Sequence, residues 1–231
     1  MIFTYLALGD SYTIGEGVLL SESFPYQTVQ LLRTTAVGAE SRRQGFGETP
    51  TAVEKPCQPA GRPVGDRQFT APEIIAKTGW TTDELNEAIQ QTTFLKHYDI
   101  VSLLIGVNNQ YRGRSAAEFE VEFTQLLQQA ISFAGTDPEK VFVLSIPDWG
   151  TTPFAEGRDR EQIASDIDAF NVLCKNVSAA LKCNYIYITT LQREDGNKSE
   201  FLAGDGLHPS GKEYEKWADK LSAAIATKFN V

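Results

Sequence analysis

The sequence predicts an α/β fold built on a mostly parallel β-sheet with helices on both faces. Segments with the pattern of strands alternate with segments with the pattern of helices along the chain, which is typical of parallel sheets. Two strand-like segments, 99–105 and 141–146, are almost continuously apolar, as expected for strands buried on both faces. The 231 residues suffice for a substantial core, so we expect a single domain over 1–231.

The first half of the chain supplies the beginning of the sheet and two of the helices. Strands are predicted at 3–8, 72–77 and 99–105, and helices at 24–33 and 82–92. Pro25 is compatible with the first helical turn, because an amide donor is not needed there. Thr81 or Thr82 can cap the start of the second helix with its hydroxyl.

The second half continues the alternation. An amphipathic helix is predicted over 115–134, since its apolar residues recur at three- and four-residue intervals. The remaining elements are strands at 141–146 and 185–190 and helices at 163–181 and 210–228. Ser115 with Glu118, and Ser210 with Glu213, have the spacing of a capping box, which marks the start of two of these helices.

One stretch, from about 34 to 68, fits neither pattern. It is rich in glycine and proline and has few large apolar residues, so it can bury little surface on ordering. We expect a mobile excursion from the domain, either a lid over the functional site or a disordered insertion.

The composition excludes several classes of function. A formal net charge of -9 argues against nucleic acid and anionic membrane surfaces as partners. Cys57, Cys174 and Cys183 form no C-x-x-C pair, so we expect reduced thiols, with a Cys174–Cys183 disulfide as the alternative. The presence of only 2 histidines leaves little room for a histidine-rich metal site.

The sequence also bears on location. No apolar run approaches the length of a transmembrane helix, so no integral membrane contact is expected. No secretory signal is visible, which favours a cytoplasmic location, or a secreted or periplasmic one if a natural leader precedes this sequence. Nothing in the sequence predicts an oligomeric state.

Two short segments near opposite ends of the chain carry residues suited to acyl transfer. Gly9-Asp10-Ser11-Tyr12 ends the first strand in an abrupt turn, and Asp205-Gly206-Leu207-His208 places a carboxylate and an imidazole three residues apart. Ser11 is the candidate nucleophile and His208 the base that removes its proton. Asp205 is the acid that would orient the imidazole.

A third group of residues could stabilise the negative charge that develops on a substrate carbonyl oxygen. The backbone N–H groups of Ser11 and Gly79 and the side-chain amide of Asn108 are the candidates for this oxyanion hole. Ser11, Gly79 and Asn108 follow the first three predicted strands, and His208 follows the last. Because the carboxyl ends of parallel strands share one edge, we expect these four residues on one rim of the sheet.

In this order, the motifs resemble those of the SGNH hydrolase superfamily, also called GDSL esterases and lipases. Gly9-Asp10-Ser11-Tyr12 is similar to the family's first block, with Tyr12 in place of leucine, and Gly79 to the glycine of the second. Gly106-Val107-Asn108-Asn109 is similar to the third block, with Asn109 in place of aspartate, and Asp205-Gly206-Leu207-His208 to the fifth. The likeness extends from the first strand to the last helix, apart from 34–68.

The resemblance implies a three-layer α/β/α sandwich with a flavodoxin-like sheet. It also implies hydrolysis of a carboxylic ester, of a small acyl group or lysophospholipid-like, through an acyl-enzyme and without metal or organic cofactor. Ser11 would be nucleophile and oxyanion donor, Gly79 and Asn108 further donors, His208 the base and Asp205 the orienting acid. The effect of Asn109 on its turn is left open.

Two other functions are compatible with these residues. A carbohydrate O-deacetylase of the same superfamily is one, because Trp80, Tyr111 and Trp149 follow predicted strand ends and could stack on a sugar ring. Plain packing in the wall of the site is the other explanation for these aromatic residues. A noncatalytic binding module is the third hypothesis, since a fold does not determine function, but the intact serine, histidine and aspartate disfavour it.

Overall fold

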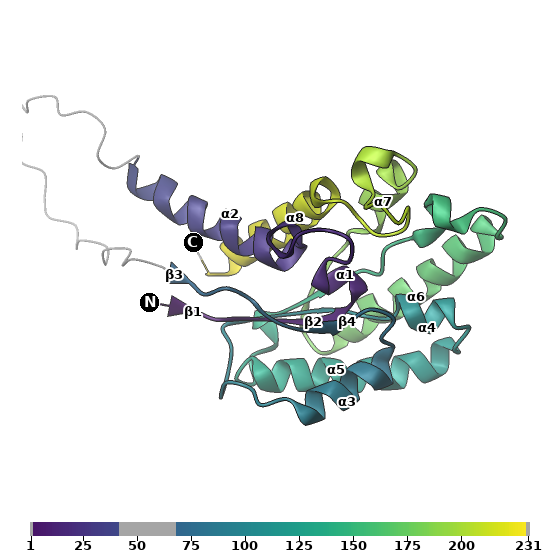
Figure 1. The fold of residues 1–231 in the computed structure, drawn as a ribbon. Coiled ribbons are helices and arrows are strands. Elements are labelled where there is room, and N and C mark those ends of the chain that lie inside the picture. Colours follow the sequence, from purple (N-terminus) through teal and green to yellow (C-terminus); the bar gives the residue numbers. More distant parts are fainter. Residues whose placement is uncertain (1, 42–67, 230–231) are drawn as a thin grey trace, which may run out of the picture.

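The computed structural model describes residues 2–41 and 68–229, which form three layers (Figure 1). The central layer is a parallel sheet of β2 (Tyr5–Asp10), β4 (Glu73–Lys77), β5 (Ile100–Leu104), β6 (Val141–Leu144) and β7 (Asn184–Ile186). The strand order is β4-β2-β5-β6-β7. Numbered along the chain, these five strands are arranged 2-1-3-4-5, which is the flavodoxin-like order. The predicted α/β/α fold class is confirmed.

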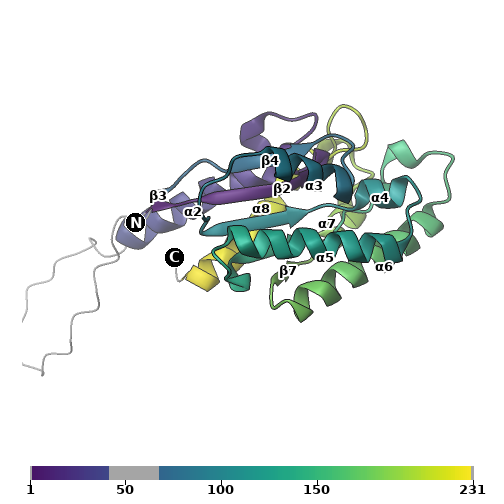
Figure 2. The same ribbon diagram turned by 90° about the horizontal axis from the view of Figure 1, so that it is seen from below.

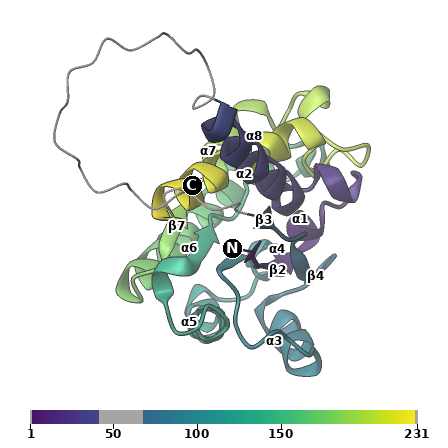
Figure 3. The same ribbon diagram turned by 90° about the vertical axis from the view of Figure 1, so that its left-hand side faces the viewer.

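Helices cover both faces of this sheet. On one face α2 (Phe24–Ser41) packs beside α8 (Gly211–Phe229). The other face carries α3 (Thr82–Gln91), α5 (Ala116–Phe133) and α6 (Arg160–Ala180), which lie in front of the sheet in Figure 2. Figure 3 shows α2 and α8 side by side, across the sheet from α3 and α5. Two short strands, β1 (Ile2–Phe3) and β3 (Gln68–Phe69), form a separate parallel pair.

The remaining described elements are short and lie in the connections. They are the α-helices α1 (Ser11–Ile14), α4 (Val107–Tyr111) and α7 (Thr189–Asp195), and the 3-10 helices η1 (Leu20–Glu22), η2 (Pro138–Lys140), η3 (Trp149–Thr151), η4 (Pro153–Ala155) and η5 (Ser199–Phe201). Three of them, α1, α4 and η3, follow β2, β5 and β6 closely. They therefore shape the edge of the sheet where the strands end.

The core lies where the sheet meets these helices. Every residue of β2, β5 and β6 is buried, as expected for strands covered on both faces. The predicted apolar stripe of α5 is buried at Phe119, Phe123, Leu126, Leu127 and Ala130. Burial of this stripe against the sheet confirms the amphipathic helix.

Two predicted boundaries were wrong by several residues, more than the others. The helix predicted over 24–33 continues to Ser41, so the first part of the predicted excursion is helical, while 42–67 lie outside the described residues. The strand predicted over 185–190 ends at Ile186. The Ser145 hydroxyl accepts hydrogen bonds from the N–H groups of Ile188 (2.8 Å) and Thr189 (3.1 Å), and α7 begins there.

One of the two predicted capping boxes has a different structure. Ser115 caps α5 as expected, accepting a hydrogen bond from the Glu118 N–H at 3.2 Å. Ser210 instead donates to the Glu200 carbonyl oxygen at 2.8 Å. The Glu213 carboxylate is buried and accepts a hydrogen bond from the Trp217 indole at 3.0 Å. Each side chain thus bonds to a partner outside the predicted capping box.

The thiols and the hydropathy of the helices can also be compared with expectation. Cys174 and Cys183 are both free and buried, so the alternative disulfide is not formed, and Cys57 lies outside the described residues. Burial raises the pKa of the Cys183 thiol to about 12, which keeps it protonated and unreactive. Among the described helices, none combines the length and the apolar character needed to cross a membrane.

Candidate active site

Ser11 begins α1 directly at the carboxyl end of β2 (Figure 1). Asp10 caps this helix, with its Oδ1 accepting a hydrogen bond from the Tyr12 N–H at 3.0 Å. Gly9 is needed because a Cβ there would lie 2.4 Å from the Leu104 carbonyl oxygen of the neighbouring strand. The tight strand-to-helix turn therefore follows from the residues around Ser11.

His208 and Asp205 meet Ser11 from a loop 197 residues away in sequence. His208 Nε2 lies 2.9 Å from Ser11 Oγ, and His208 Nδ1 lies 2.6 Å from Asp205 Oδ2. The other carboxylate oxygen, Asp205 Oδ1, accepts hydrogen bonds from the backbone N–H groups of Leu207 (2.9 Å) and His208 (3.0 Å). One side chain therefore shapes the loop and orients the imidazole at once.

The charge of Asp205 is favoured by its hydrogen bonds. Partial burial opposes ionisation, but the bonds donated by the His208 ring and by the two backbone N–H groups outweigh it and lower the pKa of Asp205. A carboxylate on Nδ1 favours the tautomer that leaves Nε2 free to accept a proton from a hydroxyl group. The arrangement is therefore suited to removing the Ser11 proton.

Tyr12, which replaces leucine in the motif, packs against the imidazole. The Tyr12 and His208 ring centroids are 5.1 Å apart, and Trp217 stacks on Tyr12 at 6.2 Å. Tyr12 is buried, and it also lines the cavity beside Ser11. An aromatic ring thus supports the side of His208 and gives this residue a packing role that the motif did not predict.

Gly79 and Asn108 come from neighbouring connections and are held together. Gly79 has a φ of 84°, a left-handed conformation that glycine adopts without strain. Asn108 Nδ2 donates to the Trp80 carbonyl oxygen at 3.0 Å, and Arg112 Nη2 donates to the Gly79 carbonyl oxygen at 2.6 Å. Since an amide NH2 group has two hydrogens, Asn108 keeps a second one for another acceptor.

The side chain of Asn109, in α4, bonds to Thr82 at the start of α3 and so links the same two connections. It is buried, its Oδ1 accepts from the Thr82 N–H at 3.1 Å, and its Nδ2 donates to Thr82 Oγ1 at 2.6 Å. The Thr82 hydroxyl in turn donates to the Glu122 carboxylate. An aspartate at this position could accept hydrogen bonds from both the N–H and the hydroxyl of Thr82. Here the N–H donates to Asn109, and the hydroxyl donates to Glu122. The Glu122 carboxylate therefore accepts the proton that an aspartate at position 109 would otherwise accept.

These groups surround a cavity of about 160 Å³. Its lining comprises Ser11, Tyr12, Thr78, Gly79, Val107, Asn108, Tyr111, Trp149, Phe154, Leu207 and His208. The structure thus brings the predicted residues Ser11, Gly79, Asn108 and His208 together, and adds Tyr111 and Trp149. Trp80, the third aromatic residue predicted for substrate contact, is not among the lining residues. It packs against the hydrophobic core instead, and its backbone carbonyl oxygen accepts the hydrogen bond from Asn108.

One side of the cavity is aromatic. We call Tyr111, Trp149 and Phe154 the aromatic wall; their ring centroids lie between 5.3 and 6.2 Å apart. Trp149 is buried and donates its indole N–H to Gln110 Oε1 at 2.8 Å. The rings of Tyr111 and Phe154 are partly exposed at the cavity's edge.

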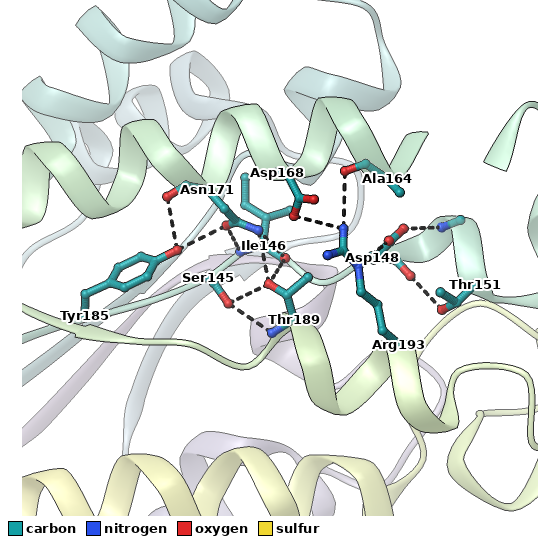
Figure 4. A network of polar contacts seen from close by, with 11 residues as sticks. Ser145, Ile146, Asp148, Thr151, Ala164, Asp168, Asn171, Tyr185, Thr189 and Arg193 are labelled. Carbon is teal, nitrogen blue, oxygen red and sulfur yellow. Dashed lines mark hydrogen bonds and ion pairs between the residues drawn. The ribbon is translucent and has the colours of Figure 1, made fainter. Parts of the chain in front are cut away.

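A polar network holds the segment that leaves β6 and leads to Trp149 (Figure 4). Asn171 of α6 binds both backbone groups of Ile146, accepting from its N–H at 2.7 Å and donating to its carbonyl oxygen at 3.0 Å. Further along, the buried Asp148 accepts a hydrogen bond from Arg193 of α7 at 2.8 Å. Arg193 also pairs with Asp168 of α6 at 2.9 Å. Two helices therefore fix the position from which Trp149 enters the cavity.

The sequence contained little signal for several of these residues. Phe154 lies in the short 3-10 helix η4 and Leu207 in an irregular loop, neither with hydrophobic periodicity, and Gln110 contributes by accepting the hydrogen bond of the Trp149 indole. Thr78 and Val107 adjoin Gly79 and Asn108, so their place in the cavity could have been inferred from the turns that carry the motifs.

Comparisons with known proteins agree with this architecture. A family model described as the GDSL-like Lipase/Acylhydrolase family matches residues 7–216. The comparison with curated proteins found no match.

Solved structures show the same fold at low identity. A lipase/acylhydrolase from Enterococcus faecalis is 19% identical with a TM-score of 0.65, covering 98% of this chain and 96% of that chain. A variant of an acetyl xylan esterase from Geobacillus stearothermophilus is 16% identical with a TM-score of 0.64, covering 96% and 94%. An esterase from a Pseudoalteromonas species is 16% identical with a TM-score of 0.59, covering 99% of each chain.

The family match decides between the classes of function that the sequence left open. It spans most of the chain and includes the segments of Ser11, Gly79, Asn108 and His208. A noncatalytic binding module is therefore set aside. The chain belongs to the GDSL-like lipase/acylhydrolase family and is an ester-hydrolysing enzyme.

Proposed function

We propose that this enzyme hydrolyses carboxylic esters of small acyl groups through an acyl-enzyme intermediate on Ser11. The observation that carries the proposal is the continuous hydrogen-bonded chain from Asp205 through His208 to Ser11, with distances of 2.6 and 2.9 Å. A serine hydroxyl becomes an effective nucleophile when a base stands ready to accept its proton.

The first half of the reaction forms the acyl-enzyme. Ser11 Oγ attacks the ester carbonyl carbon while its proton passes to His208 Nε2. The carbonyl oxygen becomes negatively charged and is stabilised by the backbone N–H groups of Ser11 and Gly79 and by the Asn108 amide. The carbon–oxygen bond to the alcohol then breaks, and the departing alkoxide takes the proton from His208.

The second half releases the acid. A water molecule gives a proton to His208 Nε2 as its oxygen attacks the acyl carbon, and the bond to Ser11 Oγ breaks as the proton returns to that oxygen. Only the neutral imidazole can start either half, because a protonated ring has no lone pair left to accept a proton. The lowered pKa of Asp205 favours its charged form, which stabilises the imidazolium formed in each half.

The size of the cavity supports a small acyl group. Its volume of about 160 Å³ is below the ~300–1,000 Å³ typical of pockets for drug-sized ligands. It is close to the ~150 Å³ of an engineered cavity that holds benzene. An acyl chain of about six carbons or fewer would therefore fill it, whereas a long chain would have to leave it.

A series of p-nitrophenyl esters from acetate to laurate tests this proposal. We expect kcat/KM to be highest between butyrate and hexanoate and to fall for longer chains. A phosphonate ester probe should become attached to Ser11, as detected by peptide mass spectrometry, and His208→Ala should suppress the labelling. A steady rise in kcat/KM toward laurate would contradict the small-acyl assignment, and labelling elsewhere than Ser11 would contradict the mechanism.

Carbohydrate O-deacetylation is a second candidate, favoured by the aromatic wall. Tyr111 and Phe154 are 43% and 42% exposed beside the serine, so a sugar ring could stack on them. Two of the structurally similar proteins are described as acetyl xylan esterases. If this candidate is correct, Tyr111→Ala should raise KM for acetylated xylo-oligosaccharides much more than KM for p-nitrophenyl acetate. An equal effect on both substrates would reject it.

A further inference from the structure

Arg158 stands over all three rings of the aromatic wall. Its guanidinium carbon is 5.2 Å from the ring centroid of Tyr111, 5.5 Å from that of Trp149 and 6.0 Å from that of Phe154. Its Nη2 donates a hydrogen bond to the Tyr111 hydroxyl at 3.2 Å. The side chain is exposed, so this cation lies at the solvent side of the wall beside the cavity.

The charge of Arg158 is not offset by a carboxylate. Within the part of the chain that the structure describes, no ion pair is formed by Arg158. The arginines that follow α4, by contrast, are paired: Arg112 with Glu84 at 3.3 Å and Arg114 with Asp83 at 2.7 Å. In a chain with a net charge of -9, carboxylates are plentiful. An unpaired guanidinium at the edge of the site is therefore a candidate for binding something else.

The geometry also leaves Arg158 able to bind an anion. A guanidinium has five N–H donors in a planar fork, and Tyr111 takes only one of them. Contacts with three aromatic rings restrict the orientation of the group through cation–π attraction. An oriented fork matches the two oxygens of a carboxylate or phosphate better than a flexible ammonium group does.

We propose that Arg158 binds an anionic group, a carboxylate or a phosphate, on the alcohol part of the ester. The inference rests on the proposed function: when the small acyl group occupies the cavity at Ser11, the alcohol extends outward past the aromatic wall. The preferred substrates are then small-acyl esters of alcohols that carry a negative charge. Arg158 determines this specificity without contacting the reacting atoms.

Two matched pairs of butyrate esters test the inference. In the phosphate arm, monobutyryl glycerol 3-phosphate is compared with neutral monobutyrin. In the carboxylate arm, 4-butyryloxybenzoate is compared with its methyl ester. For Arg158→Ala, we expect kcat/KM on the anionic member to fall about tenfold more than on its neutral partner, mainly through KM, because a charge-assisted hydrogen bond is lost. The arm with the larger effect identifies the anion.

Further variants separate recognition from structure. Arg158→Lys keeps the positive charge but not the planar fork of donors. Its loss of kcat/KM on the anionic ester, relative to the neutral ester, should therefore be smaller than that of Arg158→Ala. Lys175→Ala is the matched control, since Lys175 is an exposed cation near the other end of α6 and its removal should leave the ratio within each pair unchanged. In the unmodified enzyme, raising the salt concentration should bring kcat/KM for the anionic ester closer to kcat/KM for its neutral partner.

Binding to Ser11→Ala, measured by calorimetry with the intact esters, gives a second readout that needs no turnover. We expect the anionic ester to bind more weakly when Arg158→Ala is added, and the neutral ester to be affected less. An equal loss on both members of each pair would show that Arg158 only supports the wall and would overturn the inference. If the enzyme hydrolyses no ester at all, the proposed function fails instead, which is a distinct result.

Discussion

The segments that carry Ser11 and His208 are held by contacts within themselves, whereas the segment that carries the aromatic wall is held from elsewhere. Asp10 caps the turn of Ser11 through Tyr12, two residues on, and Asp205 binds the N–H of His208 three residues on. In the wall segment, Asp148 depends on Arg193, 45 residues away. The proposed reactive groups are thus oriented by short motifs, while the surface that faces the substrate depends on several helices.

The largest expected effect concerns the locally held segment. Ser11→Ala should lower kcat by a factor on the order of 10⁶, because removing the nucleophile of such a triad eliminates covalent catalysis. The melting temperature should change little, since the lost hydroxyl contacts His208 but not the surrounding fold. Steady-state kinetics and thermal unfolding test the two halves of this statement. A folded variant with the original kcat would disprove the nucleophile assignment.

Burial of the Asp10 side chain beside Ser11 should make the free energy of unfolding depend on pH. The side chain is fully buried, its Oδ2 has no hydrogen-bond partner among the described residues, and burial raises its pKa from 3.8 to about 7. Between these values the folded state holds a proton that the unfolded state has lost. Stability from this group is therefore full below about pH 4 and lost as the pH rises to 7, by about 4 kcal/mol.

The variant Asp10→Asn isolates this effect, because an amide oxygen can still accept the Tyr12 N–H and carries no charge. Its unfolding free energy relative to the unmodified protein should increase by about 4 kcal/mol between pH 4 and pH 8. Urea unfolding of both proteins at several pH values measures the difference. Parallel curves would mean that Asp10 titrates normally and that its burial carries no penalty.

Asn108 lies between the two kinds of region, since it belongs to a motif but bonds to Trp80, 28 residues away. Asn108→Ala should lower kcat by about 10²–10³ with little change in KM, because its amide acts on the charge of the transition state. Asn108→Asp is a useful comparison, since it keeps the size and removes the donor. A rise in KM alone would assign Asn108 to binding of the ground-state ester.

The smallest expected effect concerns the wall and falls on stability rather than chemistry. Arg193→Ala leaves the Asp148 carboxylate, whose side chain is 1% exposed, without its cationic partner. Because the Arg193 side chain is itself 28% exposed, we expect a loss of about 2–3 kcal/mol in unfolding free energy, less than the ~3–5 kcal/mol of a fully buried pair, and a larger change in KM than in kcat. Lys212→Ala, which breaks an exposed pair with Glu200, should cost at most about 1 kcal/mol. If Arg193→Ala and Lys212→Ala lowered the unfolding free energy equally, the distinction between the two regions would not hold.

The same distinction explains which features could be predicted from the sequence. Alternating patterns predicted the strands of the main sheet, and the parallel topology then placed Ser11, Gly79, Asn108 and His208 at one edge. Trp80 was predicted in the cavity because it follows a strand, but its side chain packs against the core beyond the left-handed turn at Gly79. Residue order alone does not show where a side chain points after such a turn.

Phe154 and Arg158 were beyond prediction for a related reason. Phe154 lies in the short 3-10 helix η4 and Arg158 between η4 and α6, and the chain that leads to them is held at Asp148 by Arg193 of α7, a bond that no local pattern encodes. The early end of β7 has the same origin, because Ser145 on a different segment binds the N–H groups of Ile188 and Thr189. Hydrogen bonds between distant segments decided each of these cases.

The hydrogen bond between Ser11 and His208 links residues 197 positions apart, so it closes a loop that contains most of the chain. Contacts of such high sequence separation can form only after most of the polypeptide is present. During synthesis, Ser11 is made early and stays without His208, its proposed base, until the loop of His208 has left the ribosome. A fragment that ends before this loop would therefore be unable to form the proposed acyl-enzyme, and the proposed catalysis would begin only after the loop has folded beside Ser11.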